Sequence, residues 1–148
     1  MKTKVVRLDK GDILLFRQLI HLFQEVFEME NPELADEPYL IKILSQPSFV
    51  AFVICCEDKI AGGLIGYELP MYYGEYSELY IYDVAIAPEF QRKGFGQQLF
   101  SSVKQYCAEN KIRGMFVEAS EEDEGAIEFY RSTDGVEQPV RHFDYYLK

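Results

Sequence analysis

The stretch from Leu79 to Asn110 constrains the fold of this 148-residue chain more than any other part of it. An apolar run from Leu79 to Ile86 has the length and composition of a buried strand, and Pro88 stops it. Apolar residues then recur at helical spacing from Gly94 to Asn110. A strand followed by a glycine-containing loop and a helix predicts an anion site at the helix N-terminus.

The loop from Gln91 to Gly96 has the composition of a phosphate cradle built mostly from main chain. A helix N-terminus presents unpaired N–H groups and the positive end of the helix dipole. Glycine at 94 and 96 lets backbone approach phosphate oxygens closely, and Arg92 and Lys93 add positive charge. The dinucleotide pattern Gly-x-Gly-x-x-Gly fails after Gly96, and the Gly-Lys-Ser/Thr ending of a P-loop is absent.

The rest of the chain predicts one domain, residues 1–148, of mixed α/β (α+β) class. Its order is strand, helix, helix, hairpin, strand, helix, strand, helix, strand, and Phe143 to Leu147 is the last strand. Glycines 62, 63 and 66 interrupt the second hairpin strand, and they indicate either a β-bulge or a close approach by backbone or ligand.

Charge and cysteine spacing exclude several classes of protein. The net charge of −10, from 15 basic and 25 acidic residues, argues against a nucleic-acid partner and favours a polycationic small molecule or a basic peptide. No apolar run is long enough for a membrane helix, and the N-terminus lacks a secretory signal, so we expect a cytoplasmic protein. Cys55, Cys56 and Cys107 have no metal or redox spacing, and we expect no metal.

Gln-x-x-Gly-x-Gly after Val-Ala-Ile-Ala-Pro closely resembles the acetyl-CoA signature of the GNAT acetyltransferase superfamily. The resemblance implies a mixed, mostly antiparallel sheet with a V-shaped split between strands 4 and 5, flanked by helices. It also implies that acetyl-CoA binds with its pyrophosphate on the loop and its pantetheine arm along the strand edge. The cofactor residues so implied are Val84, Ala85, Ile86, Gln91, Arg92, Lys93, Gly94, Phe95, Gly96 and Gln97.

The second half of the chain resembles the same family. Phe116 to Ala119 is similar to its fifth strand, and Asp123 to Tyr130 is similar to its helix Asn-x-x-Ala-x-x-Phe-Tyr. Tyr130 stands where the family keeps a tyrosine near the CoA sulfur, which implies a general acid for the leaving thiolate. Two departures are Asp123 in place of the usual Asn and a helix exit one residue longer than is common.

Acyl transfer to nitrogen needs a neutral amine, so a carboxylate near the thioester can act as general base. Asp83, just before the cofactor strand's Val-Ala-Ile, is the first candidate, and Glu118 on the neighbouring strand is the second. Each can also be an ordinary hydrogen-bonded strand residue. No cysteine is placed with a base by a readable motif, so we expect direct transfer in a ternary complex.

A narrower resemblance, to the GNAT-type aminoglycoside 3-N-acetyltransferases, is carried by Tyr80 to Ala85, Glu121 to Glu124 and His142 to Asp144. It implies acetylation of an aminocyclitol amine, antibiotic resistance, a homodimer, and substrate contacts from Asp83, Glu122, Asp123, Glu124 and Asp144, with His142 able to assist. The acids after Ser120 can equally be a solvated helix cap. The alternatives are a polyamine or protein/peptide amine acetyltransferase of the same fold, and a non-catalytic CoA-binding or drug-sequestering module.

Overall fold

The computed structural model of the chain describes residues 2–148, which divide into two compact units at Glu118 and Ala119. Within these residues no helix is both long and apolar enough to cross a membrane. The elements of the first unit are β1 (Thr3–Arg7), α1 (Ile13–Val26), α2 (Glu37–Leu44), β2 (Phe49–Cys56), β3 (Lys59–Pro70), β4 (Ser77–Ile86), the short 3-10 helix η1 (Pro88–Phe90), α3 (Phe95–Glu109) and β5 (Ile112–Val117). The second unit contains α4 (Glu124–Ser132).

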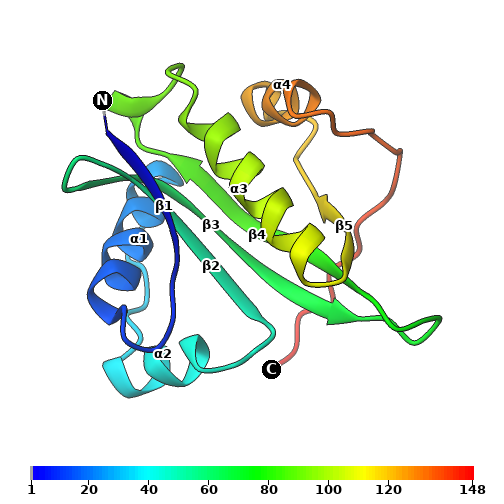
Figure 1. Cartoon of the computed structure of the whole chain (residues 1–148), viewed down its shortest axis with the longest axis horizontal. Coiled ribbons are helices and arrows are strands. Elements are labelled where there is room, and N and C mark those ends of the chain that lie inside the picture. The colour runs from blue at the N-terminus through cyan, green and yellow to red at the C-terminus, as the bar shows by residue number, and fades with distance from the viewer. Residues whose placement is uncertain (1) are drawn as a thin grey trace. The chain divides into compact units, whose positions relative to one another are not determined.

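The five strands of the first unit form one mixed sheet in the order β1-β2-β3-β4-β5 (Figure 1). Neighbours are antiparallel except β4 and β5, which are parallel. The pairing of β4 with β5 stops at Ile81 opposite Val117, and the second half of β4 pairs only with β3 among the described residues. The predicted mixed, mostly antiparallel sheet with a split between its fourth and fifth strands is confirmed.

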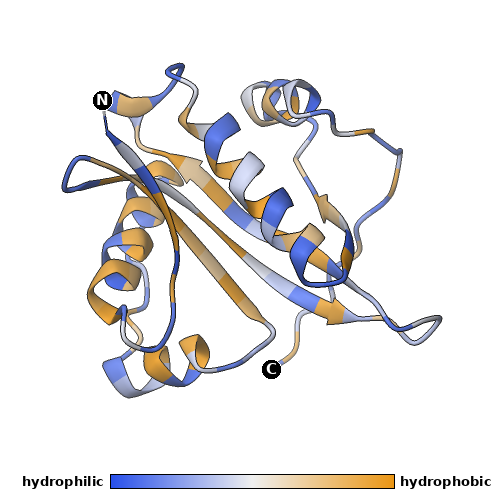
Figure 2. Cartoon of the chain, in the orientation of Figure 1, coloured by the Kyte–Doolittle hydropathy of each residue, from blue (hydrophilic) through white to orange (hydrophobic). Residues whose placement is uncertain are grey.

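Helices cover both faces of this sheet, because its central strands are apolar on both sides. β2 is buried along nearly all of its length and is apolar throughout (Figure 2). Helix α1 buries Phe16, Leu19 and Phe23 in a cluster with one face of the sheet, and α2 joins the same cluster. Helix α3 packs on the opposite face (Figure 1). The helix predicted from apolar spacing between Gly94 and Asn110 is confirmed as α3, to within one residue at each end.

The glycines of β3 are there because neighbouring atoms leave no room for a side chain. A Cβ on Gly62 would lie 2.5 Å from the carbonyl oxygen of Ala85, and one on Gly63 would collide with the Leu19 side chain of α1. A Cβ on Gly66 would lie 2.8 Å from the Tyr80 carbonyl oxygen. Of the two interpretations left open by the sequence, close approach accounts for all three glycines, and a bulge also lies beside Gly66.

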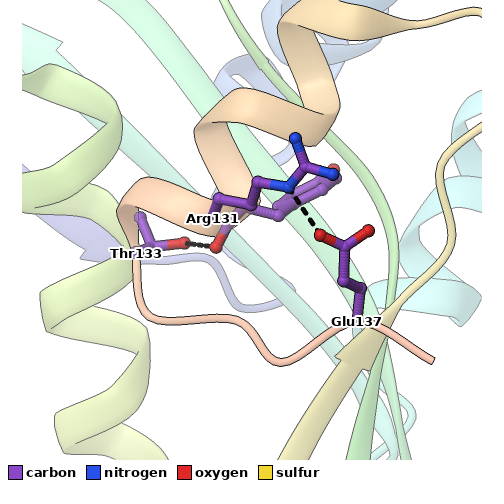
Figure 3. Close-up of polar contacts among 4 residues, drawn as sticks. Arg131, Thr133 and Glu137 are labelled. Carbon is purple, nitrogen blue, oxygen red and sulfur yellow. Dashed lines mark hydrogen bonds and ion pairs between the residues drawn. The ribbon is translucent and has the colours of Figure 1, made fainter.

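The second unit consists of α4 and a long C-terminal segment. Asp123 Oδ1 accepts a hydrogen bond from the Ala126 N–H at 3.1 Å and caps the helix. In the last turn of the helix, Arg131 Nε donates to Glu137 Oε1 at 2.6 Å (Figure 3). After the helix, Gly135 N–H donates to the Tyr130 carbonyl at 2.9 Å.

The predicted final strand, Phe143 to Leu147, is wrong. Residues 136–148 form neither helix nor strand, and Phe143, Tyr145 and Leu147 are 73%, 85% and 92% exposed. The apolar residues alternate as in a strand, but a strand also needs a partner for its N–H and C=O groups. The structure gives this segment no such partner within the described residues.

Candidate cofactor and acceptor site

The loop between β4 and α3 places the start of a long helix at the end of a strand. Gly94 is the N-cap residue of α3, and its φ of +85° lies in the left-handed region that suits glycine. No side chain caps the helix at this residue, and the first N–H groups of any helix lack intrahelical partners. The loop therefore offers main-chain donors and the positive end of a 15-residue helix to an anion.

Contacts from the loop's own side chains fix this arrangement. Gln91 Nε2 donates to the Ile86 carbonyl at 2.9 Å and ties the loop to the end of β4. Phe95 is buried and its ring lies 5.5 Å from that of Phe90, so the first turn of α3 is anchored in the core. Arg92 and Lys93 are exposed. The cradle is thus built from main chain, with the charged side chains at its rim.

The strand edge that precedes the loop has unpaired backbone. Val84, Ala85 and Ile86 pair with Leu64, Gly63 and Gly62 of β3 on one side. On the other side β5 has parted from β4, and no described strand takes its place. A free strand edge leading into a helix N-terminus suits an extended ligand that carries amide groups at one end and phosphate at the other.

Asp83 lies at the start of this free edge, next to a β-bulge. Ile65 and Gly66 are consecutive in β3 but pair with Asp83 and Ile81, so Tyr82 is the extra residue of the bulge. Asp83 is two residues from Ala85 and shares its face of the sheet, the face that α1 and α2 cover elsewhere. Burial raises the pKa of the half-buried Asp83 carboxyl above its ordinary value. The raised pKa makes this carboxylate more basic than an exposed aspartate, a property that favours proton abstraction.

Glu118, which follows β5, is held by a tyrosine of β4. The Tyr80 hydroxyl donates to Glu118 Oε1 at 2.6 Å, and the Tyr80 ring stacks on Phe116 with centroids 4.8 Å apart. The hydrogen bond to Glu118, with a smaller contribution from burial, raises the pKa of Tyr80 to about 12. The structure thus places both predicted bases in the first unit, at the point where β4 and β5 separate.

The sequence did not reveal a set of aromatic side chains on the face of the sheet that carries Asp83. Four rings from three neighbouring strands form a row that we call the aromatic strip: Tyr67, Tyr82, Tyr80 and Phe116. Two of them alternate in β4, which was a visible signal. Their connection to the other two depends on strand register and on the bulge, neither of which the sequence displays.

The remaining predicted residues belong to the second unit. Tyr130 lies on α4 and is partly buried. Glu122, Asp123 and Glu124 are exposed at the start of this helix, where Asp123 is its cap. His142 Nε2 and Asp144 Oδ1 lie 2.8 Å apart in the C-terminal segment.

Comparisons with known proteins agree with this arrangement. The sequence pattern of the acetyltransferase (GNAT) family matches residues 16–135. Among curated proteins, none matches significantly. A crystal structure of the aminoglycoside acetyltransferase meta-AAC0020, from an uncultured soil metagenomic sample and in complex with sisomicin, is 42% identical with a TM-score of 0.96, covering 99% of this chain and 97% of that one.

Two further solved structures extend the likeness. The aminoglycoside acetyltransferase HMB0005, also from an uncultured soil metagenomic sample, is 33% identical with a TM-score of 0.93, and the alignment covers 100% of both chains. The aminoglycoside N-acetyltransferase AAC(6')-Iy in complex with CoA shares the fold at 15% identity, with a TM-score of 0.77 over 99% of this chain and 95% of that one. The split sheet, the main-chain cradle and the family match agree: this chain belongs to the GNAT family of acetyltransferases.

Proposed function

We propose that this acetyltransferase moves the acetyl group of acetyl-CoA onto an amine of an aminoglycoside, at the 3-N position, by direct transfer in a ternary complex. The observation that carries the proposal is the position of Asp83, a half-buried carboxylate of raised pKa directly ahead of the free β4 edge. Such a group can bind an ammonium and take its proton. The nearly full-length similarity to meta-AAC0020, which was solved in complex with sisomicin and with trehalose, supports a sugar-like acceptor.

The residues around the loop fit acetyl-CoA. The N–H groups from Gln91 to Gln97 would hold the pyrophosphate, and the edge from Val84 to Ile86 would hold the pantetheine arm. A Cβ at Gly94 would meet nothing within 4 Å, so the approach to the cradle is open there. Acetyl-CoA supplies, when bound, the thioester whose acetyl group is transferred.

The protein's own groups then move protons and stabilise charge. Asp83 accepts the proton that the amine loses, directly or through one water, and Glu118 assists it. An N–H of the free β4 edge donates to the carbonyl oxygen as negative charge builds there. Tyr130 gives its hydroxyl proton to the departing sulfur, a role that suits a phenol with a reference pKa of about 10.

The acceptor's remaining positive charges would meet acidic residues. Glu122, Asp123, Glu124 and Asp144 are the proposed partners, with His142 beside Asp144. The net charge of −10 attracts a polycation over a longer range and disfavours nucleic acid. We place the reaction in the cytoplasm and its biological role in antibiotic resistance.

A homodimer is the proposed assembly. Its support in this chain is the C-terminal segment, where six large apolar residues are 70–92% exposed. Those residues are Val136, Val140, Phe143, Tyr145, Tyr146 and Leu147. Such a concentration of exposed apolar side chains is typical of a surface that another chain covers.

Free thiol release tests the function. Purified protein is mixed with acetyl-CoA and, separately, with sisomicin, spermidine or a lysine peptide, and Asp83→Asn protein is the control. We expect turnover on sisomicin, with the acetyl group found on N3 by NMR. Turnover on spermidine or peptide alone would establish the rival acetyltransferase activities instead. Binding of acetyl-CoA without turnover on any amine would indicate a sequestering module.

A further inference from the structure

We propose that the aromatic strip is a platform on which the sugar rings of the acceptor stack, and that it selects ring-shaped amines over linear polyamines. The inference rests on the proposed function, because it assigns the acceptor's shape to the same site. It adds a source of specificity that charge cannot supply, since linear and cyclic polyamines carry similar charge.

The strip is continuous across three strands. The centroids of Tyr67 and Tyr82 are 6.1 Å apart, those of Tyr82 and Tyr80 are 6.0 Å apart, and those of Tyr80 and Phe116 are 4.8 Å apart. Tyr80 and Phe116 lie nearly parallel, at 6°, whereas the other two contacts are edge-to-face. The row therefore offers both ring faces and ring edges along its length.

Three of the four rings of the strip are exposed, and Tyr80 is half-buried. Tyr82 is 62% exposed, Phe116 is 43% exposed and Tyr67 is 39% exposed. At its inner end the strip meets Phe49, which is buried under α1 and lies 5.5 Å from Tyr67. Adjacent exposed rings contribute little to the core, and a contiguous exposed apolar patch of this kind marks a binding surface.

The platform is also held in place before any ligand arrives. All four rings stand on strands of the sheet, and Tyr67, Tyr80 and Phe116 are at paired positions. The Tyr80 hydroxyl also donates to Glu118 Oε1 at 2.6 Å. Tyrosine has few rotatable bonds, so ordering it costs little entropy on binding. A rigid aromatic surface suits a rigid ring better than a flexible chain, which must lose more freedom to lie flat.

Two carboxylates, those of Asp83 and Glu118, lie beside the platform and attract the ammonium groups of the acceptor. Asp83 pairs with Ile65, two residues from Tyr67, and Tyr67 pairs with Tyr80, so the register places Asp83 on the same face as both rings. An ammonium of either kind of amine is attracted by these acids. A linear polyamine gains only this part, whereas an amino sugar also places its C–H face on the rings.

Substitution of single rings separates the contribution of ring stacking to acceptor binding from that of charge attraction. We expect Tyr82→Ala to raise KM for sisomicin about tenfold with kcat changed less than twofold, and to leave kcat/KM for spermidine within twofold. Tyr82→Phe should restore the wild-type value, because the ring and not the hydroxyl makes the contact. Tyr73→Ala, at an 80% exposed tyrosine of the β3–β4 turn outside the strip, is the matched control. Phe116→Leu is the second strip variant should Tyr82→Ala fail to fold.

A failure of the platform can be distinguished from a failure of the proposed function by measuring binding as well as turnover. If the wild type acetylates neither amine, calorimetric binding of sisomicin and spermidine to the same variants provides the comparison, and a selective loss of sisomicin binding still supports the platform. Equal losses for both amines, or no loss for either, would overturn it. Absence of binding by the wild type would overturn it as well.

Discussion

The proposed cofactor loop and the proposed acceptor face are built in different ways from the same strand. Residues 91–97 form the loop from consecutive main chain, and its charged side chains, Arg92 and Lys93, stand exposed at the rim. The acceptor face takes side chains from β3, β4 and β5 and depends on strand register. Side-chain substitutions should therefore damage the acceptor half strongly and the cofactor half weakly, unless they alter the loop backbone.

The largest effect is expected at Asp83. Asp83→Asn should lower kcat/KM for the amine by about 100-fold or more, because it removes the proposed base. CoA affinity, measured by calorimetry, should stay within twofold. An equal loss of CoA binding would mean that Asp83 contributes to both halves of the site.

The same variant should gain stability at neutral pH. The raised pKa of Asp83 means that the folded state holds this proton more tightly than the unfolded state does. Stability from this group is therefore fully present below its ordinary pKa and falls as pH rises through the raised value. Urea unfolding should find Asp83→Asn more stable than wild type at pH 7, with the difference shrinking towards pH 3. A variant that is less stable at pH 7 would contradict the assigned cause, which is burial of charge.

A second side-chain effect is expected at Tyr130. Tyr130→Phe should lower kcat about 10- to 100-fold, since it removes the proposed proton donor to sulfur, and should leave CoA affinity unchanged. Single-turnover thiol release measures the chemical step directly. Unchanged turnover would leave α4 with a packing role only.

On the cofactor side, a substitution that alters the loop backbone should have a clear effect. Gly94→Val places a β-branched residue at φ +85°, which costs about 1–2 kcal/mol in the left-handed region. We expect CoA affinity to fall about tenfold by calorimetry, with the sisomicin KM unaffected at saturating acetyl-CoA. Space alone is not the obstacle, because a Cβ there meets no atom within 4 Å.

The smallest effect is expected for the charged side chains of the loop. The double variant Arg92→Ala with Lys93→Ala should weaken CoA binding by no more than about threefold, because exposed charges contribute little beside a main-chain cradle. Measurement at low and high salt shows whether the residual effect is screened. A tenfold or greater loss at both salts would mean that side chains, and not backbone, hold the phosphates.

The contrast between a loop of consecutive residues and a face assembled from three strands explains which parts of the site the sequence could predict. The loop and the helix that follows could be predicted, and Asp83 could be proposed as a base, because their signals lie within a few consecutive residues. The aromatic strip could not, because Tyr67, Tyr80 and Phe116 meet only through the pairing of three strands. The segment from Phe143 to Leu147 failed for a related reason: its alternation is local, but the hydrogen-bond partners that make a strand are not.

The bulge at Tyr82 shifts by one residue the alternation of β4 side chains between the two faces of the sheet. Tyr80 and Asp83 are three residues apart, so a regular strand would direct them to opposite faces, whereas the extra residue puts them on one. Loss of a single residue here would keep the hairpin and its composition almost unchanged, yet it would uncouple the acceptor surface from the carboxylate. Substitutions ahead of the bulge can also accumulate without moving the cofactor edge behind it. One inserted residue thus lets the two halves of a single strand diversify separately.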